Sequence, residues 1–147
     1  MRFEVFLELL KLRLKKASHY IIGPSISIKI GCNPSINISN ALVDLNHKSE
    51  KRFVIFPIKI YGEKLRHLNI VLLDNKTKII ERFEPFNDYI NFKQINDLLE
   101  PFLYKLMEKK KIYFLKYQNT LNTETVLTDK NCGYYCIEYA YRKIVGF

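Results

Sequence analysis

Apolar side chains recur every three or four positions at the start of the chain. Over residues 3–16 they share one face of a helix, while charged side chains share the opposite face: Phe3, Phe6, Leu7, Leu10 and Leu14 against Glu4, Glu8, Lys11 and Lys15. This period is typical of an amphipathic helix. We expect the helix to pack onto the body of the protein, with a membrane surface as the alternative.

A different pattern begins after a break at Gly23-Pro24. Residues 25–50 have no strong period and predict only short strands or loops. Residues 53–61, 67–74 and 78–84 are rich in β-branched and aromatic side chains, and a polar turn, Asp74 to Thr77, separates the last two. They predict three strands. Because their apolar runs are nearly continuous, we expect helices on both faces of the sheet.

Helical signals return in the second half of the chain. Asn91 resembles a helix start, and the helix continues over 97–110, where Pro101 predicts a kink or a division into two short helices. Residues 112–117 predict another strand. Apolar side chains four positions apart predict a last helix over 133–145. The order predicts an α+β fold with a small mixed sheet flanked by helices, in a single domain over residues 1–147.

Composition and charge narrow the functional class. Hydrophobic residues make up 48% of the 147 residues, which excludes a disordered tail. Three cysteines, no signal-like segment and no apolar run of about 18 residues favour a reducing compartment, with no secretion and no membrane span. A formal charge of +9 favours an anionic partner such as nucleic acid, or simply a soluble surface. Candidate basic groups are Lys11, Arg13, Lys15 and Lys16, and Lys105 with Lys109 to Lys111.

The predicted hairpin places a histidine beside a carboxylate. If the turn of this hairpin is centred between Asn75 and Lys76, the residue numbers of any two paired residues add up to 151. His67 then pairs with Glu84. Directly opposite Cβ atoms are roughly 4.5–5.5 Å apart. A carboxylate in this position orients a general base, although a surface His–Glu pair would have the same pattern.

A cysteine stands at the predicted start of the last helix. Asn131-Cys132-Gly133 leads into Tyr134-Tyr135-Cys136, and the positive end of a helix dipole stabilises a thiolate. We expect Gly133 to let a substrate approach the backbone. Cys136 shares a face with Ala140 and Ile144, which predicts a buried, inert thiol. Cys132 is therefore the predicted nucleophile, and a pair of structural core cysteines is the alternative.

These motifs resemble a family of cysteine proteases. The order His67, Glu84, Cys132 is that of adenain, the adenovirus maturation protease, and of the SUMO-specific proteases. Phe83-Glu84-Pro85-Phe86 resembles the F-E-P-F of adenain, and Cys132-Gly133 resembles the Cys-Gly of both. The resemblance covers residues 53–147. It implies that Cys132 attacks a peptide carbonyl, His67 transfers the proton and Glu84 orients His67.

Two positions depart from the family pattern. Leu68 stands where the family usually has Trp, so part of the substrate cleft differs. The family glutamine of the oxyanion hole lies six or seven positions before the cysteine, where this chain has Val126 and Thr125. Gln118 is the nearest upstream glutamine and is the candidate donor if residues 119–131 fold back. A backbone amide or Asn131 is the alternative.

The resemblance leaves several functions open. The first is a viral maturation protease that cleaves capsid or other precursor proteins at small, glycine-like residues. The alternatives are a deconjugase of a ubiquitin-like modifier, an effector-type acetyltransferase and a non-catalytic binding domain. The expected partners are a protein substrate, DNA at the basic surface and an activating peptide. The expected location is the host cytoplasm or nucleus, or the virion. No cofactor and no metal site are expected, because the three histidines lie far apart in the sequence and Cys132 and Cys136 have no partner pair.

Overall fold

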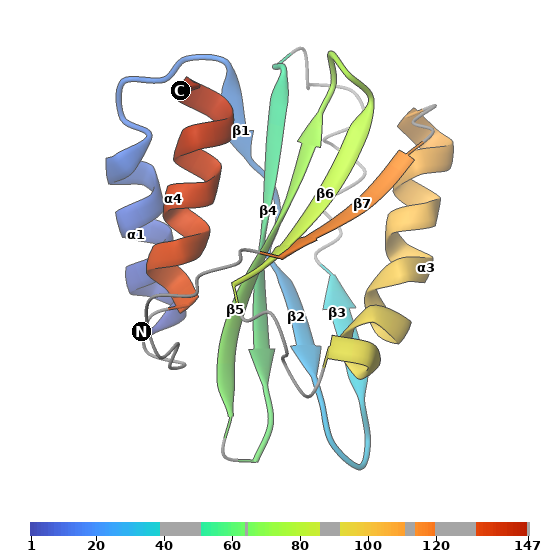
Figure 1. Ribbon diagram of the computed structural model, residues 1–147. Helices are drawn as coiled ribbons and strands as arrows, with labels where there is room; N and C mark the ends of the chain where they lie inside the picture. The colour runs from blue at the N-terminus through green and yellow to red at the C-terminus, as the bar shows by residue number, and fades with distance from the viewer. Residues whose placement is uncertain (39–50, 64, 86–91, 111–113, 120–131, 147) are drawn as a thin grey trace.

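A mixed sheet with helices on both faces forms the body of the protein (Figure 1). The computed structural model describes residues 1–38, 51–63, 65–85, 92–110, 114–119 and 132–146. Its elements are α1 (Phe3–Arg13), β1 (Tyr20–Ile22), β2 (Ile26–Lys29), β3 (Ser35–Ile38), β4 (Phe53–Tyr61), β5 (Arg66–Asp74), β6 (Ile79–Glu84), α3 (Phe92–Lys110), β7 (Phe114–Asn119) and α4 (Cys132–Val145). The α+β class and the mixed sheet are as expected from the sequence.

The strands lie in the order β3-β2-β4-β5-β6-β7. β4, β5 and β6 are antiparallel neighbours, whereas β7 runs parallel to β6 and β2 runs parallel to β4. β1 also pairs with β4 in parallel, beside Phe53 to Ile55, while β2 pairs further along the same strand. The predicted break at Gly23-Pro24 therefore separates two short strands along one edge of β4. The three-residue β1 was not expected from the sequence.

Two apolar clusters cover the two faces of the sheet. α1 and α4 lie side by side on one face, and α3 lies on the other (Figure 1). The first cluster joins Phe6 and Leu10 of α1 and Cys136 of α4 to Ile70 of β5. The second joins Ile95, Leu99 and Leu103 of α3 to apolar residues of the central strands, such as Val71. The prediction of helices on both faces of the apolar strands is confirmed.

One helix spans the region around Pro101. α3 continues from Phe92 to Lys110 with Pro101 inside it, so a division into two short helices was wrong. Asn91, the expected helix start, and residues 112 and 113 of the expected last strand lie outside the described residues.

The register of the β5–β6 hairpin differs from the predicted one by two residues. Ile70 pairs with Phe83 and Asp74 pairs with Ile79, so paired residues sum to 153 and not to 151. Four residues, 75–78, form the turn, and Lys78 has a φ of 61°, a left-handed conformation that closes it. The direct opposition of His67 and Glu84 was therefore wrong. A shift of two preserves the face, so the two residues remain diagonal neighbours.

Candidate active site

The His67 imidazole is hydrogen-bonded to the Glu84 carboxylate inside the protein. Nε2 of His67 lies 2.7 Å from Oε2 and 2.9 Å from Oε1 of Glu84, and both side chains are buried. A carboxylate only accepts hydrogen bonds, so Nε2 is the donor. In the neutral imidazole the other nitrogen, Nδ1, then carries the lone pair that can accept a proton. This is the arrangement that a general base oriented by an acid requires.

Two further buried polar side chains share this face of β5 and β6. Asn69 Nδ2 donates to Glu84 Oε1 at 3.2 Å and to the Leu68 carbonyl at 2.8 Å, and its Oδ1 accepts from Arg82 Nε at 2.8 Å. Arg82 Nη2 lies 3.6 Å from Glu84 Oε1. A buried cation thus stands beside the buried carboxylate, and the amide joins the two. The charge of Glu84 is compensated within the protein.

Sequence reasoning missed Asn69 and Arg82, although a signal was present. Each stands two positions from a predicted site residue, Asn69 from His67 and Arg82 from Glu84, and residues two apart in a strand share a face. A polar residue within a nearly continuous apolar strand is expected to find a buried partner. That alternation could have identified them.

Helix α4 brings Cys132 to the same end of the sheet. It begins at Cys132, as expected, and its middle is fixed to β6 by stacking of Tyr139 on Phe83, with ring centroids 4.4 Å apart. The Tyr139 hydroxyl donates to Glu81 Oε2, and Lys143 Nζ lies 3.2 Å from the same oxygen. Burial, followed by the bond to Glu81, raises the pKa of Tyr139 and keeps it a neutral donor.

A second contact ties α4 to the strand that carries His67. Cys136 Sγ donates to the carbonyl of Leu68 at 3.5 Å. Burial, followed by the neighbouring Cys132 and Glu84, raises the pKa of the Cys136 thiol well above its ordinary value. Cys136 is therefore a neutral core thiol at neutral pH, as its predicted burial requires.

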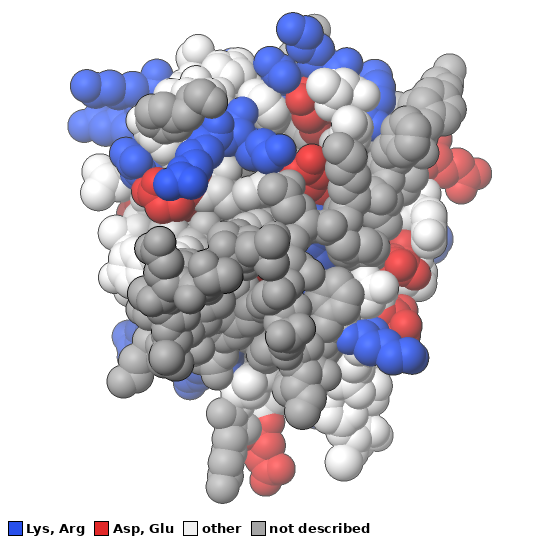
Figure 2. All heavy atoms as spheres, viewed as in Figure 1, with Lys and Arg blue, Asp and Glu red and all other residues white. Residues whose placement is uncertain are grey.

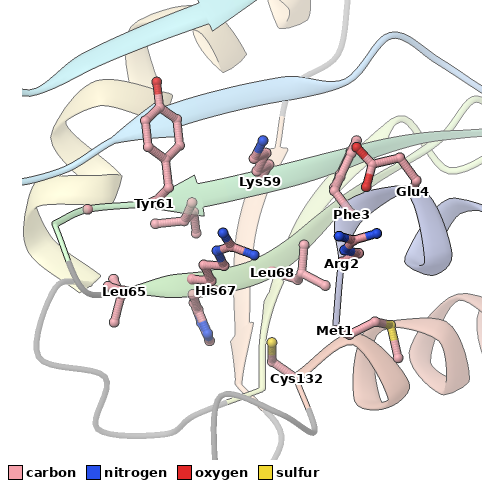
Figure 3. Close-up of a pocket in the computed structure, with 13 residues that line it drawn as sticks. Met1, Arg2, Phe3, Glu4, Lys59, Tyr61, Leu65, His67, Leu68 and Cys132 are labelled. Atoms are coloured by element: carbon pink, nitrogen blue, oxygen red, sulfur yellow. The ribbon is translucent and has the colours of Figure 1, made fainter.

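His67 and Cys132 line one pocket of about 570 Å³. In Figure 3 the His67 imidazole extends from β5 toward the side of the pocket where the Cys132 sulfur lies, at the start of α4. The other walls come from β4, from the β4–β5 connection and from the segment that leads into α1. The Cys132 thiol and the His67 imidazole, which is hydrogen-bonded to Glu84, thus lie at one cavity.

The role expected for Gly133 was wrong. A Cβ atom at this position would lie 2.7 Å from Met1 Sδ and 3.1 Å from Leu68 Cδ1. Gly133 is buried beneath these two side chains, so its backbone is not open to a substrate. Its missing side chain instead lets Met1 close over the start of α4 and form part of the pocket wall (Figure 3).

The predicted oxyanion donor is placed only by its backbone. Gln118 lies in β7 beside Phe83, and Asn119 lies beside Glu84. The side chains of β7 and all of residues 120–131, with Thr125, Val126 and Asn131, lie outside what the structure describes. A role for Gln118 stays a prediction.

Positive charge collects away from the pocket as well. Figure 2 shows lysines and arginines gathered at the end of the molecule where α4 ends. Of the predicted basic group, Arg13 is already paired with Glu138 at 2.9 Å and stacks on the Tyr141 ring. DNA binding through this surface stays a prediction. In the described part of the chain, no cluster of potential metal ligands occurs and no helix is long and apolar enough to cross a membrane.

Comparison with known proteins gives one sequence relative and several structural neighbours. No protein-family model matches the chain. It is 28% identical to the "Uncharacterized protein 082L" of Invertebrate iridescent virus 3, over 97% of this chain and 88% of that protein. One similar solved structure is the SUMO protease Ulp1 with its catalytic cysteine oxidized to a sulfinic acid. It matches 99% of this chain with a TM-score of 0.60, at 12% sequence identity.

The C-terminal Ulp1 protease domain in complex with Smt3, the yeast ortholog of SUMO, matches with a TM-score of 0.59 at 13% identity over the whole of this chain. This chain spans 66% and 67% of the two Ulp1 chains, about two thirds of their length. At this identity the match shows a shared fold. The SUMO-protease-like fold expected from the sequence is confirmed, and the particular likeness to adenain stays a prediction.

Proposed function

We propose that this protein is a cysteine endopeptidase in which Cys132 is the nucleophile, His67 the general base and Glu84 the group that orients His67. The observation that carries the proposal is the buried His67–Glu84 hydrogen bond at the pocket that Cys132 also lines. The Ulp1-like fold supports it, because that fold is the one used by a cysteine protease.

The geometry suggests the following reaction. His67 takes the thiol proton at Nδ1 while Nε2–H remains bonded to Glu84, and the thiolate attacks the peptide carbonyl. The backbone N–H of Cys132, at the free first turn of α4, stabilises the oxyanion, with Gln118 as the proposed second donor. His67 returns the proton to the leaving amine. A water then hydrolyses the thioester, releasing the acid and restoring the thiol.

For the substrate, we propose precursor proteins of a virus, cleaved after small, glycine-like residues. The sequence relative from an iridescent virus supports a viral setting. The resemblance of residues 53–147 to the adenain motifs supports precursor processing. Leu68 and Met1 stand close together over Gly133, which favours a narrow cleft beside Cys132.

A second candidate is a deconjugase of a ubiquitin-like modifier. The similarity to the Ulp1 domain solved with Smt3 favours it. The two candidates differ in what must be recognised. A deconjugase needs the folded modifier as well as its C-terminal tail, whereas an endopeptidase cleaves a short peptide of suitable sequence.

The test compares the wild-type protein with a Cys132→Ser variant on both kinds of substrate. We expect hydrolysis of short Gly-containing peptides by the wild type and none by the variant, with a Cys32→Ser variant as the matched control, because Cys32 is exposed and lies outside the pocket. Cleavage confined to fusions of ubiquitin-like modifiers would favour the deconjugase. Hydrolysis that survives Cys132→Ser would overturn the proposed function.

A further inference from the structure

The pocket at Cys132 is lined by three cationic side chains from three separate elements. Arg2 precedes α1, Lys59 lies on β4 and Arg66 begins β5, whereas Glu4 is the one anionic side chain among the described lining residues. Lys59 and Arg2 are drawn around the pocket in Figure 3. All three cations are exposed, so each can reach a ligand without being freed from the core.

The sheet register brings two of these cations together. Lys59 is paired with Leu68 and Tyr61 with Arg66, so Lys59 and Arg66 are diagonal neighbours on one face. Diagonal positions on adjacent strands are roughly 7–8 Å apart, within reach of long side chains. Like charges at this distance repel each other unless an anion lies between them.

The three cations around the pocket form no ion pair within the part of the chain that the structure describes, whereas some cations elsewhere do. Some cations on other surfaces are paired with a carboxylate: Arg13 with Glu138, Arg52 with Asp74 and Lys93 with Asp97. Among the described residues, no ion pair involves Arg2, Lys59 or Arg66. The Lys59 ammonium lies 5.7 Å from the centre of the Tyr61 ring, a cation–π contact with a neutral ring that does not neutralise its charge.

From these positions we propose that the pocket binds an acidic side chain of the peptide substrate, an aspartate or glutamate close to the scissile bond, through Lys59, Arg66 and Arg2. The proposal rests on the proposed function, because it assumes that Cys132 is the nucleophile. A carboxylate placed between Lys59 and Arg66 removes their mutual repulsion and gains two charge-assisted hydrogen bonds. Substrates with an acidic residue at that place are therefore favoured over neutral ones.

One experiment uses peptide pairs that differ only in Glu against Gln at each position around the cleaved bond. We expect one position at which Glu raises kcat/KM about fivefold at low salt, the effect of roughly one close charge pair at a surface, with loss of the effect at high salt. Lys59→Glu with Arg66→Glu should reverse the preference, and Lys59→Gln with Arg66→Gln should abolish it. A Glu/Gln ratio near one at every position would overturn the proposal.

A second experiment needs no substrate. In a Cys32→Ser background, the rate of Cys132 alkylation by anionic iodoacetate is divided by the rate with neutral iodoacetamide. The proposal predicts that the Lys59→Glu, Arg66→Glu variant lowers this ratio about fivefold. Lys11→Glu with Lys15→Glu, which changes the net charge equally outside the pocket, should leave the ratio unchanged. Equal ratios in all three proteins would contradict the proposal.

The two experiments separate the two levels of inference. If no peptide is cleaved and the alkylation ratio falls only in the Lys59, Arg66 variant, the proposed function fails and the anion-binding pocket stands. If peptides are cleaved through Cys132 with no acidic preference and no change in the ratio, the proposed function stands and the anion-binding pocket fails.

Discussion

His67 Nε2 lies 2.7 Å from Glu84 Oε2, although the two residues do not face each other in the β-ladder. They are diagonal neighbours, and the long glutamate side chain spans the offset. The diagonal leaves room for Asn69, whose amide reaches the same carboxylate, and for Arg82 behind it. Glu84 is thus bound on several sides, so its carboxylate holds the imidazole in one tautomer.

The unequal roles proposed for His67 and Glu84 predict unequal losses of activity. His67→Ala removes the proposed base, and general-base catalysis contributes about 10² to 10⁴ in rate, so kcat should fall by that amount. Glu84→Gln keeps an oxygen that accepts from Nε2 and loses only the charge, so its loss should be clearly smaller. Steady-state kinetics of both variants checks this. A Glu84→Gln loss as large as that of His67→Ala would show that the charge does more than orient the ring.

The buried Arg82 predicts a large effect on folding. Arg82→Met leaves the Glu84 carboxylate buried without its cation, and breaking a buried ion pair from one side costs about 3–5 kcal/mol. Urea unfolding should show that loss in the free energy of unfolding. Arg52→Met is the matched control, because the Arg52–Asp74 pair is more exposed and should matter much less. Similar losses in both variants would contradict the compensating role of Arg82.

The two cysteines of α4 should differ in reactivity and in its pH dependence. Because burial raises the pKa of Cys136, its thiol stays protonated at neutral pH, and iodoacetamide should label Cys132 first. The raised pKa also makes the stability of the fold depend on pH. The thiol of Cys136 ionises in the unfolded chain above its ordinary pKa of about 8.5 but stays protonated in the folded protein, so the free energy of unfolding falls as the pH rises past that value. Cys136→Ala should therefore lose less stability than the wild type on going from pH 7 to pH 10.

Peptide mapping after brief alkylation, in a Cys32→Ser background, measures the order of labelling. Cys132→Ala should abolish activity, and Cys136→Ala should mainly lower stability. Rapid labelling of Cys136, with a Cys132→Ala variant still active, would move the nucleophile one turn along the helix.

We expect Gly133→Ala to change the shape of the pocket without changing the fold. In Gly133→Ala the new Cβ meets Met1 Sδ at 2.7 Å, and this end of a flexible side chain can move aside. Alanine is also about 1 kcal/mol better than glycine within a helix, which offsets the crowding. We expect a nearly unchanged melting temperature and a several-fold rise in KM. An unchanged KM would show that Met1 is not part of the substrate cleft.

The sequence predicted the sheet because its strands have a strong local signal. Runs such as Phe53 to Tyr61 are mostly β-branched and aromatic, and their apolar character on both sides predicted helices on both faces. The register was missed because a two-residue turn was assumed, whereas the chain uses four residues with Lys78 in a left-handed conformation. An even shift does not change which side chains share a face, so the pairing of His67 with Glu84 survived the error.

The walls of the pocket could not be predicted in the same way. Met1, Lys59 and Arg66 come together only because α1, β4 and β5 meet at one end of the sheet, and no local pattern encodes that meeting. The position of Cys132 at the start of α4 was predicted because a helix start is a local feature of the sequence, here with a cysteine and a glycine at its first positions. Asn69 and Arg82 were only partly predictable. The alternation of side chains along a strand places each of them on the same face as His67 or Glu84, but it does not show which residues they contact.

Reaction with a peptide vinyl sulfone that ends in glycine, followed by mass spectrometry and peptide mapping, tests the assignment of Cys132, His67 and Glu84 most directly. We expect one adduct per molecule at Cys132 in the Cys32→Ser background, formed much more slowly in His67→Ala and absent in Cys132→Ser. An adduct on Cys136, or labelling of Cys132 at the same rate with and without His67, would contradict a nucleophile activated by the His67–Glu84 pair.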